Sequence, residues 1–420
     1  MSDKKPIRVF IVEQRGSGGM IHYAYQMCTA MAKTGVDVTL VTSSNYELSN
    51  YPHNFTVNKL MKLWPLTDQL LSNPPKNQLE AIFRKIYWTG RRGVRAVRLI
   101  VQWVKLTNYL AKARPDVIQF GATEFPFEVI FLQYLKRKGL TLSQICHEFE
   151  PRDTEKSILT SLNNQLFFNI LQTFSIIFLH GEANRKRFLE LFNIPQERLH
   201  LIPLGNEQIF QMANDSEEFS EILRTKYGLT SSDKVVLFFG NITPSKGVSV
   251  LLEAFREVHT QDEHAKLLIA GMPSREIDMN SLFHLTSSLG ISESTIFDTR
   301  YLPMEEVGPL MNLATVVVYP YINSTQSAAL QTAYAFGKPV ISTNVGGLPE
   351  AVDNGKSGIL VPPNSPEALG KAILKITNDS HLATEMGQYA YHLSQTRFAW
   401  EPIAKQILDT YEEALYETNS

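Results

Sequence analysis

The residues with the clearest chemical potential lie in a polar loop, 323–327, that precedes a segment expected to be a helix ending at Gly337. The first-turn N–H groups of a helix and its dipole together stabilise an anion such as a diphosphate. A polar side chain one to two turns farther along would reach a ribose whose phosphates bind at the helix start. The candidate ligands in this stretch are Asn323, Thr325, Gln326, Ser327 and Gln331.

Glycine-rich turns follow the first apolar strand expected in each half of the chain. The first turn contains Gly18 and Gly19, and the second runs from Gly240 through Asn241 to Lys246. Glycine lets the backbone approach a ligand closely, and a lysine supplies a positive charge for phosphate oxygens. Neither turn has the spacing of a dinucleotide fingerprint or a Walker loop. The first is interpreted either as a ligand-binding turn or as a tight connection between a strand and a helix. The second is interpreted either as a phosphate-binding turn or as a turn that carries a surface lysine.

A histidine stands at the carboxyl end of another expected strand, in the run Cys146-His147-Glu148 that continues to Pro151. At that position it would orient a sugar hydroxyl or stabilise developing charge. The alternative is a histidine whose hydrogen bonds are satisfied within its own loop. No cluster of histidine and cysteine has the spacing of metal ligands, so we expect no bound metal.

Short β-branched runs alternate with longer helical stretches, which predicts two parallel sheets with crossover helices. These sheets would position the turns described above. A chain of 420 residues exceeds one ordinary core, and the pattern restarts after a charged break at 211–221. Such sheets bind ligands beyond the carboxyl ends of their strands, so we expect the site in a cleft between two domains. The expected strands are Ile7–Val12, Val36–Val41, Asp116–Phe120, Gln144–Cys146, Ile176–Leu179, Leu199–Pro203, Val235–Phe239, Lys266–Ala270, Thr315–Tyr319, Pro339–Ser342 and Gly358–Val361.

The composition argues against several classes of protein. A formal net charge of −2 does not suit a nucleic-acid binder held by bulk charge. Only Cys28 and Cys146 are present, which fits a reducing compartment. We find no signal-peptide core and no apolar run long enough to span a bilayer. The sequence therefore predicts a cytoplasmic protein.

One segment, residues 84–114, is strongly basic, and from Ala81 to Pro115 the chain has no acidic residue. Five of its polar residues recur at spacings of four and three, so on a helix they would form one narrow stripe in a mostly apolar circumference. One interpretation is a core helix with a solvated basic edge. The other is a surface, peripheral on the cytoplasmic membrane face, that contacts anionic lipid or a phosphate-bearing acceptor. The stripe consists of Arg91, Arg95, Arg98, Gln102 and Lys105.

Taken in order, these motifs resemble the family 4 glycosyltransferases, which are retaining enzymes with the GT-B fold, and the resemblance covers nearly the whole chain. Thr325-Gln326-Ser327 is similar to a variant of the family's donor loop. The resemblance implies an α/β protein with two doubly wound Rossmann-like domains that face a central cleft. It implies an acceptor-side domain at 1–206, a sugar-nucleotide domain at 207–395, and a last segment, 396–420, whose helix crosses back to the first domain. The matching stretches are Gly18-Gly19, His147-Glu148, Ile202–Asn206, Gly240, Lys246-Gly247, Ala270-Gly271, Ala335–Val340 and Gly346–Glu350.

The resemblance also implies an activity: transfer of a hexose, with retention, from a nucleoside diphosphate sugar to an acceptor hydroxyl. The donor would be a UDP- or GDP-sugar, with no further cofactor, and the acceptor a glycan, a lipid-linked glycan or a small molecule. His147 and Lys246 would be the catalytic residues, and the backbone near Arg300 and Tyr301 would hold the base.

Three positions depart from the family's pattern. Asn323 and Gln331 stand where the family usually carries glutamates, and Asn241 stands where it often has an arginine. An amide binds a hydroxyl without charge assistance, which weakens each contact by about 1 kcal/mol, and asparagine cannot replace a bidentate guanidinium. These departures motivate an alternative, a catalytically weak or inactive GT-B scaffold that binds a sugar nucleotide or a partner enzyme. A third interpretation is a nucleotide-sugar epimerase on the same fold.

Overall fold

The computed structural model describes residues 6–62, 78–123, 125–149, 167–213 and 217–419. The chain divides into two compact units, which are described separately. Unit 1 comprises Met1–Phe178, Phe192–His200 and Ala404–Ser420, and unit 2 comprises Leu179–Leu191 and Leu201–Ile403.

Unit 1 is built on a seven-stranded sheet in the order β3-β2-β1-β4-β5-β6-β7. Neighbouring strands from β3 through β6 pair in parallel. The strand order reverses between β1 and β4, which is the topological switch point of this sheet. The strands are β1 (Arg8–Val12), β2 (Asp37–Ser43), β3 (Thr56–Met61), β4 (Val117–Phe120), β5 (Thr141–Ile145), β6 (Ile176–Leu179) and β7 (Leu199–Leu201).

Helices complete unit 1, and the last helix of the chain contributes its C-terminal part. Tyr411 on that helix donates a hydrogen bond to Gln119 Oε1 of β4 at 2.5 Å, and its ring packs against Phe178 of β6. The helices are α1 (Gly19–Lys33), α2 (Gln78–Ala113), α3 (Glu128–Arg137) and α15 (Trp400–Asn419), with short 3₁₀ turns η1 (Glu47–Asn50) and η3 (Gln196–Arg198).

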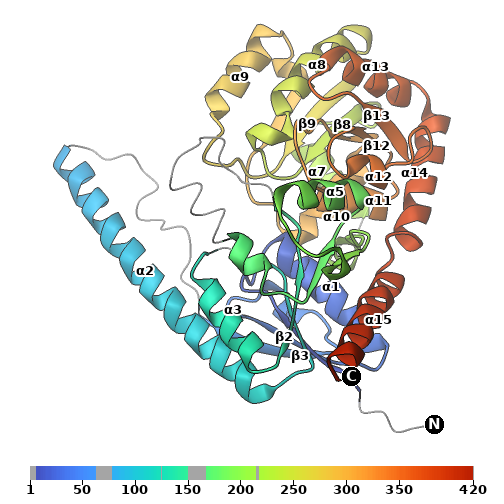
Figure 1. Ribbon diagram of the computed structural model, residues 1–420. Helices are drawn as coiled ribbons and strands as arrows, with labels where there is room; N and C mark the ends of the chain where they lie inside the picture. Colours follow the sequence, from blue (N-terminus) through green and yellow to red (C-terminus); the bar gives the residue numbers. More distant parts are fainter. Residues whose placement is uncertain (1–5, 63–77, 124, 150–166, 214–216, 420) are drawn as a thin grey trace. The chain divides into compact units, whose positions relative to one another are not determined.

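Unit 2 contains a six-stranded parallel sheet in the order β10-β9-β8-β11-β12-β13, with its switch point between β8 and β11. Helices α8 and α13 pack against each other and onto the sheet (Figure 1). The strands are β8 (Lys234–Phe239), β9 (Ala265–Ala270), β10 (Thr295–Asp298), β11 (Val316–Tyr319), β12 (Val340–Thr343) and β13 (Gly358–Val361). The helices are α5 (Glu182–Leu191), α6 (Ile209–Ala213), α7 (Glu217–Lys226), α8 (Val248–Gln261), α9 (Met279–Ser288), α10 (Met304–Leu313), α11 (Ala328–Ala335), α12 (Leu348–Ala351), α13 (Pro366–Thr377) and α14 (Ser380–Gln395), with 3₁₀ turns η4 (Pro244–Lys246) and η5 (Ser292–Ser294).

All eleven strands expected from the sequence are present, with ends shifted by up to three residues. Two further strands, β3 and β10, were not expected, and each lies at the edge of its sheet. An edge strand pairs on one side only and needs fewer apolar residues. Strand β3 accordingly carries Asn58 and Lys59 in its middle, which hides it from a search for apolar runs.

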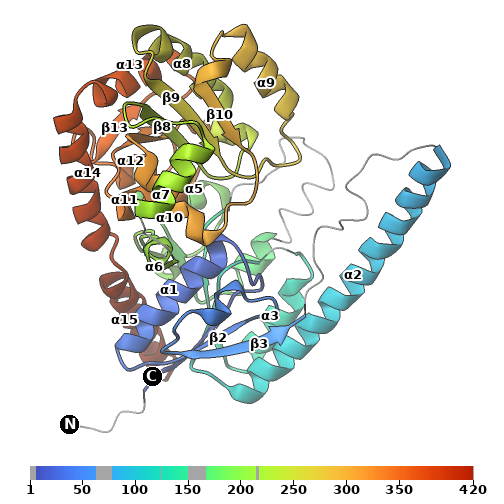
Figure 2. The ribbon, with the colours of Figure 1, turned by 180° about the vertical axis from the view of Figure 1, so that it is seen from behind.

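The basic segment forms the long helix α2, on which Arg98 and Lys105 of the predicted stripe are exposed. Within the stripe, Arg91 and Gln102 are buried, Gln102 Oε1 accepts from the Lys62 N–H at 3.0 Å, and Arg98 Nε donates to the Lys62 carbonyl at 3.1 Å. Lys62 directly follows edge strand β3, so the polar stripe satisfies backbone groups that the sheet leaves open. The two views show the C-terminal part of α2 beside α3 and β3 (Figures 1 and 2).

Among the helices of the described ranges, none combines the length and the apolar character that crossing a bilayer requires.

The segment Leu179–Leu191 is held within unit 2 by hydrogen bonds from distant loops. The Glu350 carboxylate accepts from the N–H groups of Glu182 and Ala183, at 2.9 and 2.7 Å, and so caps the N-terminus of α5. This places a negative charge where the first N–H groups of a helix need acceptors. Asn184 Nδ2 donates to the Thr325 carbonyl at 2.9 Å, which joins α5 to the polar loop.

His180 lies fully buried at the start of this segment. Its Nδ1 lies 3.2 Å from the Ile202 carbonyl, which can only accept, so this nitrogen carries the hydrogen. Burial lowers the pKa of His180 to about 4, partly offset by hydrogen bonds to backbone carbonyls. The imidazole is therefore neutral at physiological pH.

This neutral histidine predicts a loss of stability in acid. The unfolded chain takes up a proton near pH 6.5 and the folded chain only near pH 4, so stability is complete above pH 6.5 and falls as the pH drops between these values. Lowering the pH from 7 to 5 should cost about 2 kcal/mol of unfolding free energy from this group. Urea unfolding at the two pH values measures it. The difference should shrink by that amount in His180→Gln, and an unchanged difference would contradict the assignment.

Candidate functional site

The sequence-predicted pieces in unit 2 meet at the switch point of its sheet. Gly240 directly follows β8, and the polar loop follows β11, so both begin at the carboxyl ends of the two central strands. An α/β sheet binds ligands in the crevice that opens there, because adjacent connections run to opposite faces of the sheet.

Close backbone contacts join the turn after β8 to the loop after β11. The Ser245 carbonyl accepts from the N–H of Ile322 at 2.8 Å. Gly247 has a φ of 67°, and a Cβ on it would lie 2.0 Å from the Pro320 carbonyl oxygen. Only glycine fits this position, because the backbone is left-handed there and because no space is left for a side chain.

Two further glycines bring the turn against helix α11. A Cβ on Gly271 would lie 1.9 Å from the Gly240 carbonyl oxygen, so the backbones after β9 and β8 are in direct contact. A Cβ on Gly240 would lie 3.7 Å from the Cβ of Ala329, which is in the first turn of α11. The glycine turn therefore lies beside the N-terminus of that helix.

Lys246 lies against Tyr321, a residue that the sequence analysis did not single out. The lysine Nζ is 3.6 Å from the centre of the Tyr321 ring, and this ring is buried. The Tyr321 hydroxyl is 3.1 Å from Ser327 Oγ, which in turn accepts from the Leu330 N–H and caps α11. One buried ring thus connects the ammonium group with the helix start, and both favour an anion.

Gln331 is almost completely buried in the second turn of α11. Its Oε1 finds no hydrogen-bond partner among the residues that the structure describes. A buried acceptor without a donor is costly, so a ligand hydroxyl reaching this oxygen would be favoured. Asn241 and Asn323, the other two atypical residues, are exposed.

The two residues at the middle of the polar loop support its shape. The Thr325 carbonyl accepts from the Gly347 N–H at 3.0 Å as well as from Asn184. Gln326 Nε2 donates to the His180 carbonyl at 3.0 Å, so its side-chain amide is engaged within the protein. Any ligand contact by Gln326 would therefore come from its backbone.

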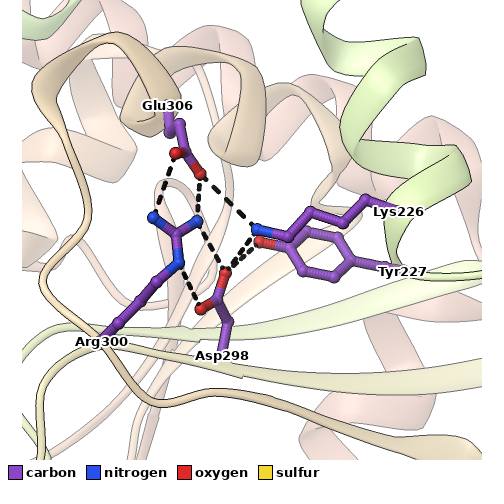
Figure 3. A network of polar contacts seen from close by, with 5 residues as sticks. All are labelled: Lys226, Tyr227, Asp298, Arg300 and Glu306. Atoms are coloured by element: carbon purple, nitrogen blue, oxygen red, sulfur yellow. Dashed lines mark hydrogen bonds and ion pairs between the residues drawn. The ribbon is translucent and has the colours of Figure 1, made fainter.

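The side chain of Arg300 is fixed in a network of five residues (Figure 3). Its Nε donates to Asp298 Oδ1 at 2.8 Å and its Nη1 to Glu306 Oε1 at 3.1 Å. Lys226 Nζ and the Tyr227 hydroxyl also donate to Asp298 Oδ2, at 3.0 and 2.7 Å.

The network keeps Asp298 ionised. Burial alone would raise the pKa of its carboxyl, but the hydrogen bonds from Tyr227, Arg300 and Lys226 hold it below its usual value. The guanidinium of Arg300 is committed to these carboxylates, and the following Tyr301 is exposed. The Arg300 side chain is therefore engaged within the protein, and the predicted contact of Arg300 and Tyr301 with the base stays one of their backbone.

Gly18 and Gly19 lie in unit 1, at the N-terminus of α1. Gly18 has a φ of 87°, and its N–H donates to Glu47 Oε1 at 2.7 Å. The same oxygen lies 2.6 Å from Nε2 of the buried His22. A carboxylate of the protein itself thus occupies this helix N-terminus, and no spacing in the sequence indicated Glu47 or His22.

His147 also lies in unit 1, two residues beyond the end of β5, and is half-buried. Its ring packs edge-on against Tyr23 of α1, with 4.7 Å between the ring centres. Residues 150 and 151, which close the predicted turn, lie outside the described residues. Within the described ranges, no three histidine, cysteine or acidic side chains gather so as to hold a metal ion.

A buried acid, Glu13, marks the switch point of the sheet in unit 1 and was also missed. It follows β1, and its Oε1 accepts from the Arg15 N–H at 3.1 Å. A Cβ on Gly121, which follows β4, would lie 2.3 Å from its Oε2. Its place directly after an apolar strand was a usable sequence signal.

Comparison with known proteins places two family models side by side on the chain. The model described as Glycosyltransferase Family 4 matches residues 17–206, and the model described as Glycosyl transferases group 1 matches residues 219–393. A D-inositol 3-phosphate glycosyltransferase of Corynebacterium efficiens is 29% identical over 95% of this chain and 91% of its own length. The match to its counterpart from Corynebacterium glutamicum is 27% identical over 66% of each chain, and that from Corynebacterium jeikeium is matched over 58% of its length.

Solved structures with the same fold cover nearly all of the chain. The sucrose-phosphate synthase of Thermosynechococcus elongatus superposes with a TM-score of 0.72, at 19% identity, over 98% of this chain and 100% of its own. Anabaena Alr3699/HepE in complex with UDP-glucose has a TM-score of 0.71 at 16% identity, over 97% and 100%. With two parallel α/β sheets and two adjoining family models, the chain belongs to the family 4 and group 1 glycosyltransferases and has the GT-B fold.

Proposed function

We propose that the protein transfers a hexose, with retention of configuration, from a nucleoside diphosphate sugar to an acceptor hydroxyl. The observation that carries the proposal is the meeting of Lys246, the Gly240 turn and the N-terminus of α11 at one switch point. The Gly240–Lys246 turn and the start of α11 at Ala328 are far apart in the sequence. Together they supply what a diphosphate needs: a cation, an open backbone and oriented N–H groups.

The residues would divide the work along the donor. Lys246 and the first turn of α11 would stabilise the charge that develops on the leaving diphosphate, which is electrostatic catalysis by groups already in place. Gln331 Oε1 would accept a hydrogen bond from a ribose hydroxyl, and the backbone at Arg300–Tyr301 would contact the base. His147 would orient the sugar, and Gly18 and Gly19 would lie near the phosphates.

We propose the donor and the acceptor only as chemical classes. Anabaena Alr3699/HepE binds UDP-glucose, which makes UDP-sugars the first donors to test, with GDP-sugars next. The inositol 3-phosphate glycosyltransferases among the relatives suggest a phosphate-bearing acceptor beside glycans and lipid-linked glycans. A cytoplasmic location at the membrane face belongs to the same proposal. The alternative function is a scaffold that binds the donor without turnover, and it is motivated by the atypical residues Asn241, Asn323 and Gln331.

Titration calorimetry with UDP-, GDP- and ADP-sugars separates these functions. Tight binding of one donor, followed by slow release of its nucleoside diphosphate, is the result expected of an enzyme. Binding without release, or without transfer to any acceptor, would favour the scaffold. A protein that bound none of the three would refute the donor site.

Lys246→Ala should weaken binding of the nucleoside diphosphate by about tenfold or more, because a charged phosphate contact contributes about 1.5–3 kcal/mol. The matched control is Lys356→Ala. Lys356 also lies over a tyrosine ring of unit 2, that of Tyr389, but on the loop before β13. Calorimetry on the two variants gives the comparison, and equal affinities would place the phosphates elsewhere.

Tyr321→Leu should weaken diphosphate binding by about three- to tenfold, since the lysine loses the ring that holds it and such contacts contribute about 0.5–2 kcal/mol. Tyr321→Phe retains the ring and should bind close to normally. The decisive measurement is a double-mutant cycle: in the Lys246→Ala background, Tyr321→Leu should have little further effect. If the two losses simply add, Tyr321 acts through general packing and not through Lys246.

A further inference from the structure

The outward face of helix α2 is apolar, which is unusual for a surface helix. Its exposed aliphatic residues recur at spacings of three and four along about three turns, and each leaves 43–63% of its surface exposed. We call them the α2 apolar face: Val94, Val97, Ile100, Val101 and Val104.

The face results from the way α2 meets its own unit. Gln102 and Arg98 of its polar stripe bond to the backbone at Lys62, and Trp103, Leu106 and Leu110 fill the core beside them. The exposed side of the helix therefore carries an aliphatic arc with exposed cations of the stripe beside it. An amphipathic surface helix normally has the opposite arrangement, with its polar arc outward.

Cations border this face and extend along the helix. Arg98, Lys105 and Lys112 are exposed, and the whole stretch from Ala81 to Pro115 carries nine basic residues and no acidic one. A helix of 36 residues is about 54 Å long. Aliphatic side chains in one arc with cations beside them are the features of a helix that lies in the plane of an anionic lipid surface.

We propose that the α2 apolar face docks onto a bilayer of anionic lipid. The valines and Ile100 enter the boundary between headgroups and acyl chains, and the bordering lysines and arginines bind lipid phosphates. Pairing with a second copy of α2 would also cover the face, but it would bring two strings of like charges together, which is unfavourable. The negative lipid surface is complementary to the same charges.

The test uses the full chain and vesicles, with no sugar nucleotide, so it succeeds or fails independently of the donor site. The wild type should co-sediment with vesicles of phosphatidylglycerol mixed with phosphatidylcholine, and much less with pure phosphatidylcholine. The variant Val94→Gln, Val97→Gln, Val101→Gln, Val104→Gln should lose at least about tenfold in partitioning. Lys105→Gln and Lys112→Gln should each lose about fivefold.

The matched control is Ile222→Gln, which removes a similarly exposed aliphatic residue from α7 of unit 2 and should bind as the wild type does. A site-directed probe removes any doubt about folding. Both native cysteines are buried, so Val101→Cys can be labelled selectively with a polarity-sensitive dye. Its emission should shift to the blue on adding anionic vesicles, whereas the same dye at Ile222→Cys should not respond.

Three results would overturn the proposal. They are absence of wild-type binding to anionic vesicles, undiminished binding by the four-glutamine variant, and a wild-type dimer in sedimentation velocity that this variant converts to a monomer. The last result would assign the face to a second copy of the chain.

Discussion

The arrangement in unit 2 depends on one constraint, the contact of two backbones at the sheet's switch point. Gly247 lies so close to the Pro320 carbonyl that a side chain would not fit between them, and the same holds for Gly271 and the Gly240 carbonyl. Any side chain at either glycine would separate the turn after β8 from its neighbours. Because the backbones touch, Lys246 reaches the Tyr321 ring, and the Gly240 turn reaches the first turn of α11.

The same contact decides the electrostatics of the site. The loop after β11 and the start of α11 contain no carboxylate between residues 320 and 331, so no acid of this segment competes with an anion for the ammonium of Lys246 and the helix start. Glu350, which follows the next strand β12, is bound to the N-terminus of α5. Unit 1 differs, because there a carboxylate of the protein, that of Glu47, occupies the N-terminus of α1. An incoming phosphate would there meet a helix whose Gly18 N–H is already bound, so the glycines of α1 are a weaker anion site than those beside α11.

Sequence reasoning succeeded where chemistry follows chain order. Apolar runs in the sequence indicate the strands, and the carboxyl ends of parallel strands lie at one edge of a sheet. Gly240 and the loop at 323–327 could therefore be predicted to lie in one region. It failed where an interaction joins residues by proximity alone. No spacing relates Tyr321 to Lys246 or Glu47 to Gly18, and edge strands such as β3 lack the apolar content that reveals a central strand.

Helix α2 shows the limit of reading amphipathicity from periodicity. The pattern separated a polar stripe from an apolar arc, but it could not say which members of each are buried. The backbone at Lys62 contributes to that choice, because its hydrogen bonds to Gln102 and Arg98 satisfy groups that an edge strand leaves open. Satisfying that edge turns the valines outward, and five exposed aliphatic residues in one arc are a liability for any protein that meets only water. A surface that accepts aliphatic side chains and attracts cations removes the liability, and an anionic bilayer has both properties.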